Sequence, residues 1–232
     1  GRRRLGAPGA VERRRRMSSH ESPAARERMP KERMAAFSDG VIAIIITIMV
    51  LELKAPKGAD ATALLSVLPV FLAYVLSFIY VGIYWNNHHH LLSTFEQVNG
   101  RILWANMLLL FWLSLIPFAT GWMDEHHLAS LPVALYGAVL LLAGCSYYLL
   151  QTTIVRAHGR DGVLAAALGA DIKGKFSIAV YVVAIALAFY WPAVSVALYL
   201  LVAAMWFVPD RRIERAVPAP LNPTRNDPPD GA

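Results

Sequence analysis

The residues that could do chemistry in this chain gather where long apolar segments begin and end. The most unusual set is Arg33, Phe37, Ser38, Asp39 and Gly40, which stands at the head of an unbroken apolar run. An arginine and an aspartate at the head of a lipid-facing helix are costly unless they are paired or hydrated. Positions six residues apart lie on different faces of a helix, so Arg33 and Asp39 each need a partner on another helix or another subunit. The alternative is that Ser38 and Asp39 cap the helix N-terminus.

A second cluster, His88-His89-His90, raises the question of a metal site. Three consecutive positions of a helix point about 100° apart, so one ion cannot take all three as ligands. Pairs of the His-x-x-x-His type are absent from the sequence. We therefore predict no metal and no cofactor, and we assign the histidines to structural hydrogen bonding at an interface.

The remaining polar groups do not form an enzyme site. The sequence has no Gly-rich phosphate-binding loop, no nucleophile elbow and no pair of carboxylates inside an apolar segment. The single cysteine, Cys145, has no second thiol for a disulfide or a metal site. Glu52 and the segment 124–127 could raise the local cation concentration; for the segment, a solvated loop is the alternative. We predict that the protein is not an enzyme.

The elements that must hold these groups are membrane-spanning helices. Of the 232 residues, 56% are hydrophobic and 16% are charged, and the mean hydropathy is +0.45. A soluble domain of this size needs more charge on its surface, so the surplus apolar residues must face lipid. The sequence predicts an all-α integral membrane protein with six transmembrane helices per subunit. The predicted spans are 34–53, 66–84, 102–121, 131–151, 175–190 and a sixth that ends near residue 208.

The ends of the chain and its basic residues predict an orientation. Residues 1–30 and 209–232 are predicted to be disordered tails, the first of them basic, around a transmembrane domain over 31–208. If the tails and the segments after the second and fourth spans share one side, that side holds 20 of the 22 Lys and Arg, against only Lys54 and Lys57 opposite. Both termini are therefore predicted to be cytoplasmic, in the plasma membrane.

The arginines near the N-terminus have two other interpretations. They lie too far from the first apolar segment to belong to a secretory signal peptide. A basic tail on a membrane protein usually lies against anionic headgroups or fixes orientation. We therefore predict the lipid bilayer, and no nucleic acid, as a partner of the chain.

The series R-x-x-x-F-S-D-G at the head of the first span resembles the transmembrane protein 175 family, also called the domain of unknown function 1211 family. Residues 33–40 fit every position of the motif, and an Ile-rich run and the segment 51–54 follow as they do in that family. The six-span layout is similar to the bacterial single-repeat form over residues 31–208. The cluster of Trp85 with His88 and His89 also looks like that family.

The resemblance implies a potassium-permeable cation channel, assembled as a homotetramer in which the first helix of each subunit lines a central pore. Its apolar constriction would fall on Ile44, Ile48 and Leu51, which share one stripe of a helix. Potassium ions would shed part of their hydration there, and gating would occur by widening or dewetting. Thr47 matches a threonine tied to ion preference, and bonding of its hydroxyl to a backbone carbonyl one turn earlier is the alternative.

The resemblance also implies a structural role for the motif at the cytoplasmic end of the pore helix. The side chains would tie that end to its neighbours, through His88 or His89. The residues assigned to this role are Arg33, Phe37, Ser38, Asp39, Gly40, His88 and His89.

Two other functions remain open at this stage. A secondary transporter or proton-coupled carrier usually carries ionisable groups near the bilayer midplane and helices broken by Gly or Pro. The predicted spans lack midplane charges, and Pro69, Pro117 and Pro192 lie toward their ends. A membrane enzyme that used Asp39 with the histidine cluster would require a bound metal.

Overall fold

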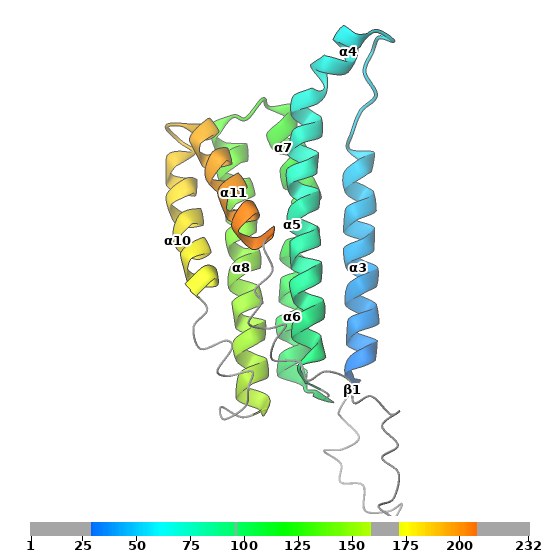
Figure 1. Cartoon of the computed structure of the whole chain (residues 1–232), viewed down its shortest axis with the longest axis vertical. Coiled ribbons are helices and arrows are strands. Elements are labelled where there is room, and N and C mark those ends of the chain that lie inside the picture. The colour runs from blue at the N-terminus through cyan, green and yellow to red at the C-terminus, as the bar shows by residue number, and fades with distance from the viewer. Residues whose placement is uncertain (1–28, 96, 159–171, 208–232) are drawn as a thin grey trace, which may run out of the picture.

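The protein is a bundle of long helices that run side by side (Figure 1). The structure, a computed structural model, describes residues 29–95, 97–158 and 172–207. Its helices are α3 (Lys31–Leu51), α4 (Ala61–Ser66), α5 (Leu68–Ser93), α6 (Gly100–Ser114), α7 (Ile116–Glu125), α8 (Ser130–His158), α10 (Ile172–Leu187) and α11 (Pro192–Phe207). The first long helix, α3, stands at one edge of the bundle, and α10 stands at the opposite edge.

Four segments of the described chain are long and apolar enough to cross a membrane. They are α3, α5, the stretch Gly100–Glu125 that combines α6 and α7, and Ser130–Ala157 within α8. Helices α10 and α11 have 16 residues each, which corresponds to about 24 Å of helix. A transmembrane helix usually needs roughly 20 residues. The prediction of a mostly helical membrane protein is confirmed, with four spans of full length.

Prolines set the breaks between consecutive helices. Pro117 has no N–H to donate to the carbonyl of Leu113, and α6 ends at Ser114 just before it. The predicted span 102–121 is therefore two helices that meet at Leu115. Pro69 stands in the first turn of α5, where a missing N–H costs no hydrogen bond.

Helix α5 is longer than the sequence predicts. The prediction ends this span at Tyr84, whereas the helix continues to Ser93. Trp85 and His88 make hydrogen bonds to side chains of neighbouring helices, and the hydroxyl of Thr94 donates to the last turn. Because these polar side chains are paired, the helix can continue beyond its apolar part. The histidine cluster consequently lies inside α5.

A short strand pair corrects the end of the predicted N-terminal tail. β1 (Met29–Pro30) is antiparallel to β2 (Gln97–Val98), with Met29 opposite Val98 and Pro30 opposite Gln97. The tail boundary at residue 30 is wrong by these two residues, because their backbone pairs with the loop between α5 and α6. The pair is also a small exception to the all-α prediction. The rest of the predicted tails, 1–28 and 209–232, lies outside the described residues.

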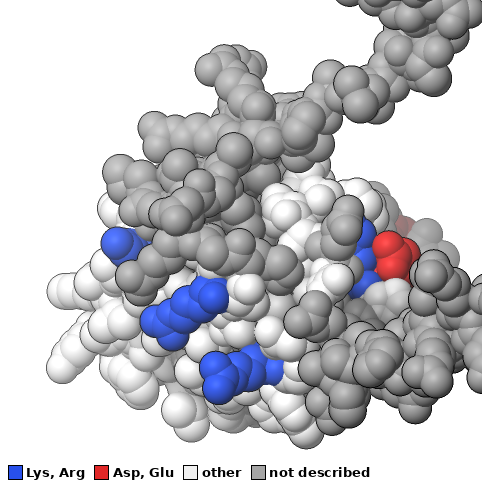
Figure 2. All heavy atoms as spheres, turned by 90° about the horizontal axis from the view of Figure 1, so that it is seen from below, with Lys and Arg blue, Asp and Glu red and all other residues white. Residues whose placement is uncertain are grey.

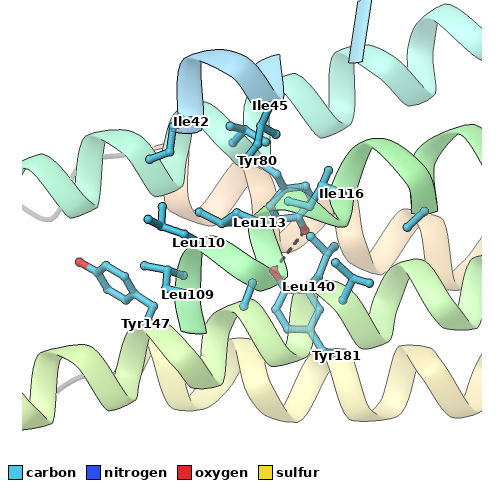
Figure 3. Packing of buried hydrophobic residues seen from close by; sticks show 14 of the residues in the cluster. Ile42, Ile45, Tyr80, Leu109, Leu110, Leu113, Ile116, Leu140, Tyr147 and Tyr181 are labelled. Atoms are coloured by element: carbon cyan, nitrogen blue, oxygen red, sulfur yellow. Dashed lines mark hydrogen bonds between the residues drawn. The ribbon is translucent and has the colours of Figure 1, made fainter. Parts of the chain in front are cut away.

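One face of α3 packs against the bundle. Ile42 and Ile45 point from α3 toward Leu110 and Leu113 of α6 (Figure 3), and all four side chains are buried. Met49 continues this buried face toward the end of the helix. The packed face fixes which side of α3 remains free.

Candidate functional site

The free side of α3 carries an apolar stripe. Ile44, Ile48 and Leu51 expose 58%, 44% and 78% of their surface, and their spacing of four and then three residues places them on one face. Phe37 and Gly40 extend the same face toward the start of the helix, and a Cβ added at Gly40 would meet nothing within 4 Å. The residues that the resemblance assigns to a constriction therefore lie together on the unpacked side of α3.

The hydroxyl of Thr47 lies beside this stripe. It donates a 2.9 Å hydrogen bond to the backbone carbonyl of Ile44, one turn earlier, and the side chain is exposed. This is the back-bonding geometry that the sequence left as an alternative. A hydroxyl that donates in this way still has lone pairs with which to accept, so Thr47 presents an oxygen acceptor next to the apolar stripe.

A buried polar chain joins three helices near the motif. His88 of α5 lies 2.7 Å from the Asn106 side-chain oxygen of α6, and the Asn106 amide donates to the Ser38 hydroxyl of α3 at 2.9 Å. Ser38 in turn donates to the Met34 carbonyl at 2.8 Å. Because the Asn106 oxygen can only accept, His88 must donate from Nε2. Buried polar groups in a membrane require such partners.

Asp39 makes a second, more exposed tie between α3 and α5. Its carboxylate accepts a 3.0 Å hydrogen bond from the indole N–H of Trp85. The ring of Trp85 also lies 6.1 Å from that of His89. Helix α3 begins at Lys31, well before Ser38 and Asp39, so the alternative that these two residues cap the N-terminus is wrong.

The motif residues thus divide between two surroundings. Ser38 and His88 are buried in the polar chain, whereas Arg33, Phe37 and His89 are exposed. Within the described ranges, the side chain of Arg33 makes no ion pair or hydrogen bond. The sequence analysis missed Asn106, although an asparagine in the middle of an apolar span is a visible signal for a buried polar contact.

A groove of about 800 Å³ opens between α3, α5 and α7. Ile44 and Ile48 form part of its wall, and Glu52, Asp124 and Glu125 line its end away from the motif, together with Lys54 and His127. The Glu52 carboxylate passes so close to α7 that a Cβ at Gly121 would be 3.4 Å from it. In the described part of the chain, no three His, Cys, Asp or Glu residues are grouped so as to hold a metal ion.

The chain is thus a helical membrane protein whose first helix leaves an apolar stripe free beside a groove with acidic side chains at one end. The profile of a family described as "Endosomal/lysosomal potassium channel TMEM175" matches residues 33–117. A potassium channel of Chryseobacterium sp. (strain P1-3) is 52% identical over 189 residues, which cover 82% of this chain and 98% of that protein. The chain belongs to the TMEM175 family.

More distant relatives agree with this assignment. A potassium channel of Chamaesiphon minutus is 35% identical over 118 residues, or 47% of this chain and 58% of that protein. The human endosomal/lysosomal proton channel TMEM175 is 35% identical over 105 residues, which are 40% of this chain but only 21% of the human protein.

A solved structure shares the fold. The crystal structure of a lysosomal potassium-selective channel TMEM175 homologue from Chamaesiphon minutus superposes with a TM-score of 0.68 and 28% identity, over 78% of this chain and 97% of that one. The resemblance drawn from the motif is therefore confirmed. The family is one of ion channels and not of enzymes, which also confirms the prediction that the protein is no enzyme.

Proposed function

We propose that this protein is a potassium-permeable channel of the plasma membrane, assembled as a homotetramer in which α3 of each copy lines a central pore. The observation that carries the proposal is the unpacked apolar stripe of Ile44, Ile48 and Leu51 on α3. The names of the bacterial relatives as potassium channels support the choice of ion.

The surroundings of the stripe favour a pore over contact with lipid. An apolar stripe alone would be equally stable against acyl chains, but carboxylates in a lipid-facing surface are costly. The groove beside the stripe ends at Glu52, Asp124 and Glu125, so water must reach that end. A wet, acidic mouth that leads to an apolar wall is what a cation meets on entering a channel with a hydrophobic constriction.

The proposed mechanism needs no coupled chemical step. In a tetramer, four copies of Ile44 and of Ile48 would form two apolar rings, and water would leave a ring that is narrow enough. A cation would pass by losing part of its hydration, so preference would come from pore radius and from the cost of dehydration. The hydroxyl oxygen of Thr47, next to these rings, would offer a polar contact to a partly dehydrated ion.

We also propose six spans per subunit with both termini in the cytoplasm. Helices α10 and α11 would be the fifth and sixth spans, since a span shorter than the bilayer can be accommodated by local thinning. The exposed aromatic pair Tyr190 and Trp191 stands at the turn between them, which suits a membrane interface. Lys54 and Lys57 lie next to α4, whereas the basic groups seen in Figure 2 lie at the other end of the bundle. The richer end faces the cytoplasm.

The proposal is tested by potassium flux into liposomes that contain the purified protein. The wild type should dissipate a potassium gradient without any coupled substrate. Ile44→Asn should raise the flux or reduce the preference for potassium over sodium, because a polar side chain wets the constriction. Val182→Asn is the matched control, because Val182 is similarly exposed, at 53%, but lies on α10.

The outcomes separate the parts of the proposal. A change in Ile44→Asn together with unchanged flux in Val182→Asn supports a pore on α3. Unchanged flux and preference in both variants would remove Ile44 from the pore. Flux that appears only with a proton or sodium gradient would point to a coupled transporter instead.

A further inference from the structure

A shallow groove runs between α6 and α8, on a face of the bundle that takes no part in the proposed pore. Its lining includes Asn99, Arg101, Trp104, Leu108, Leu149 and Thr153. Trp104 is 76% exposed, among the most exposed large apolar side chains of the described chain. A tryptophan so exposed on a membrane helix is typical of the layer between acyl chains and headgroups.

The α6 wall of the groove changes from basic to apolar along the helix. Arg101, Trp104 and Leu108 follow one another at spacings of three and four, so they share one face. At 1.5 Å per residue, Trp104 lies about 4.5 Å and Leu108 about 10 Å from Arg101 along the axis. The order is a cation, an interfacial aromatic ring and an aliphatic side chain, which is the order of groups met on entering one leaflet of a bilayer.

The α8 wall changes in the same direction. Thr153 lines the groove near the end of α8, and Leu149 lines it one turn deeper in the membrane. Arg156 is three residues beyond Thr153, on the same face and nearer the aqueous phase, and it is exposed. The lining of both walls therefore runs from a polar residue to an apolar one, and Arg156 lies just beyond the lined part of α8.

The described residues supply no acidic partner for the charge at the polar end. Within the described ranges, Arg101 makes no ion pair with an acidic side chain. Figure 2 shows several basic groups on this underside of the bundle, and an acidic group beside one of them. Anionic lipids of the cytoplasmic leaflet attract basic groups placed in this way.

We propose that the groove between α6 and α8 binds one anionic phospholipid of the cytoplasmic leaflet, such as a phosphatidylglycerol. Its phosphate lies between Arg101 and Arg156, and Asn99 and Thr153 add neutral hydrogen-bonding groups. One acyl chain lies over Trp104, Leu108 and Leu149. A guanidinium matches a phosphate with two parallel N–H donors, so arginine at this end favours a phosphodiester. The inference rests on the orientation proposed above and not on the pore.

The test uses the tryptophan itself as the probe. The full-length protein is reconstituted in phosphatidylcholine with rising fractions of dibrominated phosphatidylglycerol or dibrominated phosphatidylcholine, because bromine quenches indole fluorescence on contact. Subtracting the fluorescence of a Trp104→Phe variant isolates the signal of Trp104 from that of the other five tryptophans. Brominated phosphatidylglycerol should quench this signal at a mole fraction roughly 25-fold lower than brominated phosphatidylcholine, because each of the two arginines contributes about a fivefold preference for an anionic lipid.

Substitutions test whether the groove is responsible for the preference for phosphatidylglycerol. Arg101→Gln and Arg156→Gln should each reduce the preference, while Lys57→Gln, at the other end of the bundle, should leave it unchanged. Equal quenching by the two lipids would overturn a headgroup site. No quenching by either lipid would show that another copy of the chain covers the groove, and would also overturn it. Potassium flux measured on the same vesicles tests the channel separately, because Arg101 lies outside the proposed pore.

Discussion

The amide of Asn106 in α6 donates a hydrogen bond to the hydroxyl of Ser38 in α3, across 68 residues of sequence and through a buried part of the bundle. The same asparagine accepts from His88 of α5. One side chain therefore fixes the distances between the proposed pore helix and its two neighbours. If Asn106 is replaced by an apolar residue, His88 loses this partner and Ser38 loses one of its two.

Asn106→Leu should lower the thermal stability of the detergent-solubilised protein. The substitution leaves the buried His88 without its partner, which costs about 1–3 kcal/mol, whereas Ser38 still donates to the Met34 carbonyl. Ser114→Ala is the control, because the exposed Ser114 hydroxyl bonds only to its own helix. Heating followed by size-exclusion chromatography gives the melting temperature of each variant. Equal melting temperatures for the wild type and Asn106→Leu would show that the polar chain contributes little.

Asp39→Ala should chiefly reduce the yield of assembled protein or alter gating. The exposed carboxylate holds the Trp85 indole and stands at the start of the free face of α3, so its loss loosens the end of that helix. The assembled fraction on gel filtration and the flux per assembled channel give the two readings. Normal assembly with changed ion preference would place Asp39 in the permeation path and contradict the structural role.

The long apolar segments of the sequence predicted the helices, but the break before Pro117, inside the predicted span 102–121, was missed. It could not choose the free face of α3, because this helix is apolar on all sides and lacks an amphipathic pattern. Only packing shows that Ile42 and Ile45 are inside and Ile44 is outside. Without the family resemblance, the sequence offered no reason to select Ile44.

The polar chain through His88, Asn106 and Ser38 shows a second limit of prediction from a single sequence. The resemblance assigned Ser38 and His88 to contacts between neighbouring helices, and each makes a hydrogen bond to Asn106 of α6. It did not pair them through Asn106, because the contact depends on how three helices cross and not on spacing within one helix. The extension of α5 past Tyr84 was missed for the same reason. The polar residues of this extension remain helical because they bond to side chains on other helices, which the sequence of α5 alone does not show.

Gly137→Ala should destabilise the bundle where α8 meets α10 and α11. A Cβ at Gly137 would overlap the hydroxyl of Tyr199 and lie 2.9 Å from Cγ1 of Ile185. Tyr199 is fully buried and its hydroxyl donates to the Val133 carbonyl, so it cannot move aside easily. Overpacking of this kind costs about 1–3 kcal/mol.

The control for this change is Gly82→Ala in α5. A Cβ at Gly82 would meet nothing within 4 Å, and alanine is favoured over glycine in a helix by up to about 1 kcal/mol. The melting temperature should therefore fall for Gly137→Ala and stay level or rise for Gly82→Ala. A fall of the same size in both variants would mean that the close approach of Tyr199 is not the cause.

Labelling of introduced cysteines should reveal the orientation of the chain. The native thiol is first removed by Cys145→Ser, and Lys57→Cys or Arg101→Cys is then added. A membrane-impermeant maleimide applied to intact cells should label the first variant, because Lys57 lies at the α4 end that we place outside. It should label the second only after the membrane is permeabilised, because Arg101 lies at the basic end that the positive-inside rule assigns to the cytoplasm. The opposite pattern would invert the membrane orientation and move the proposed lipid site to the outer leaflet, while leaving the apolar stripe on α3 and its test by flux as they stand.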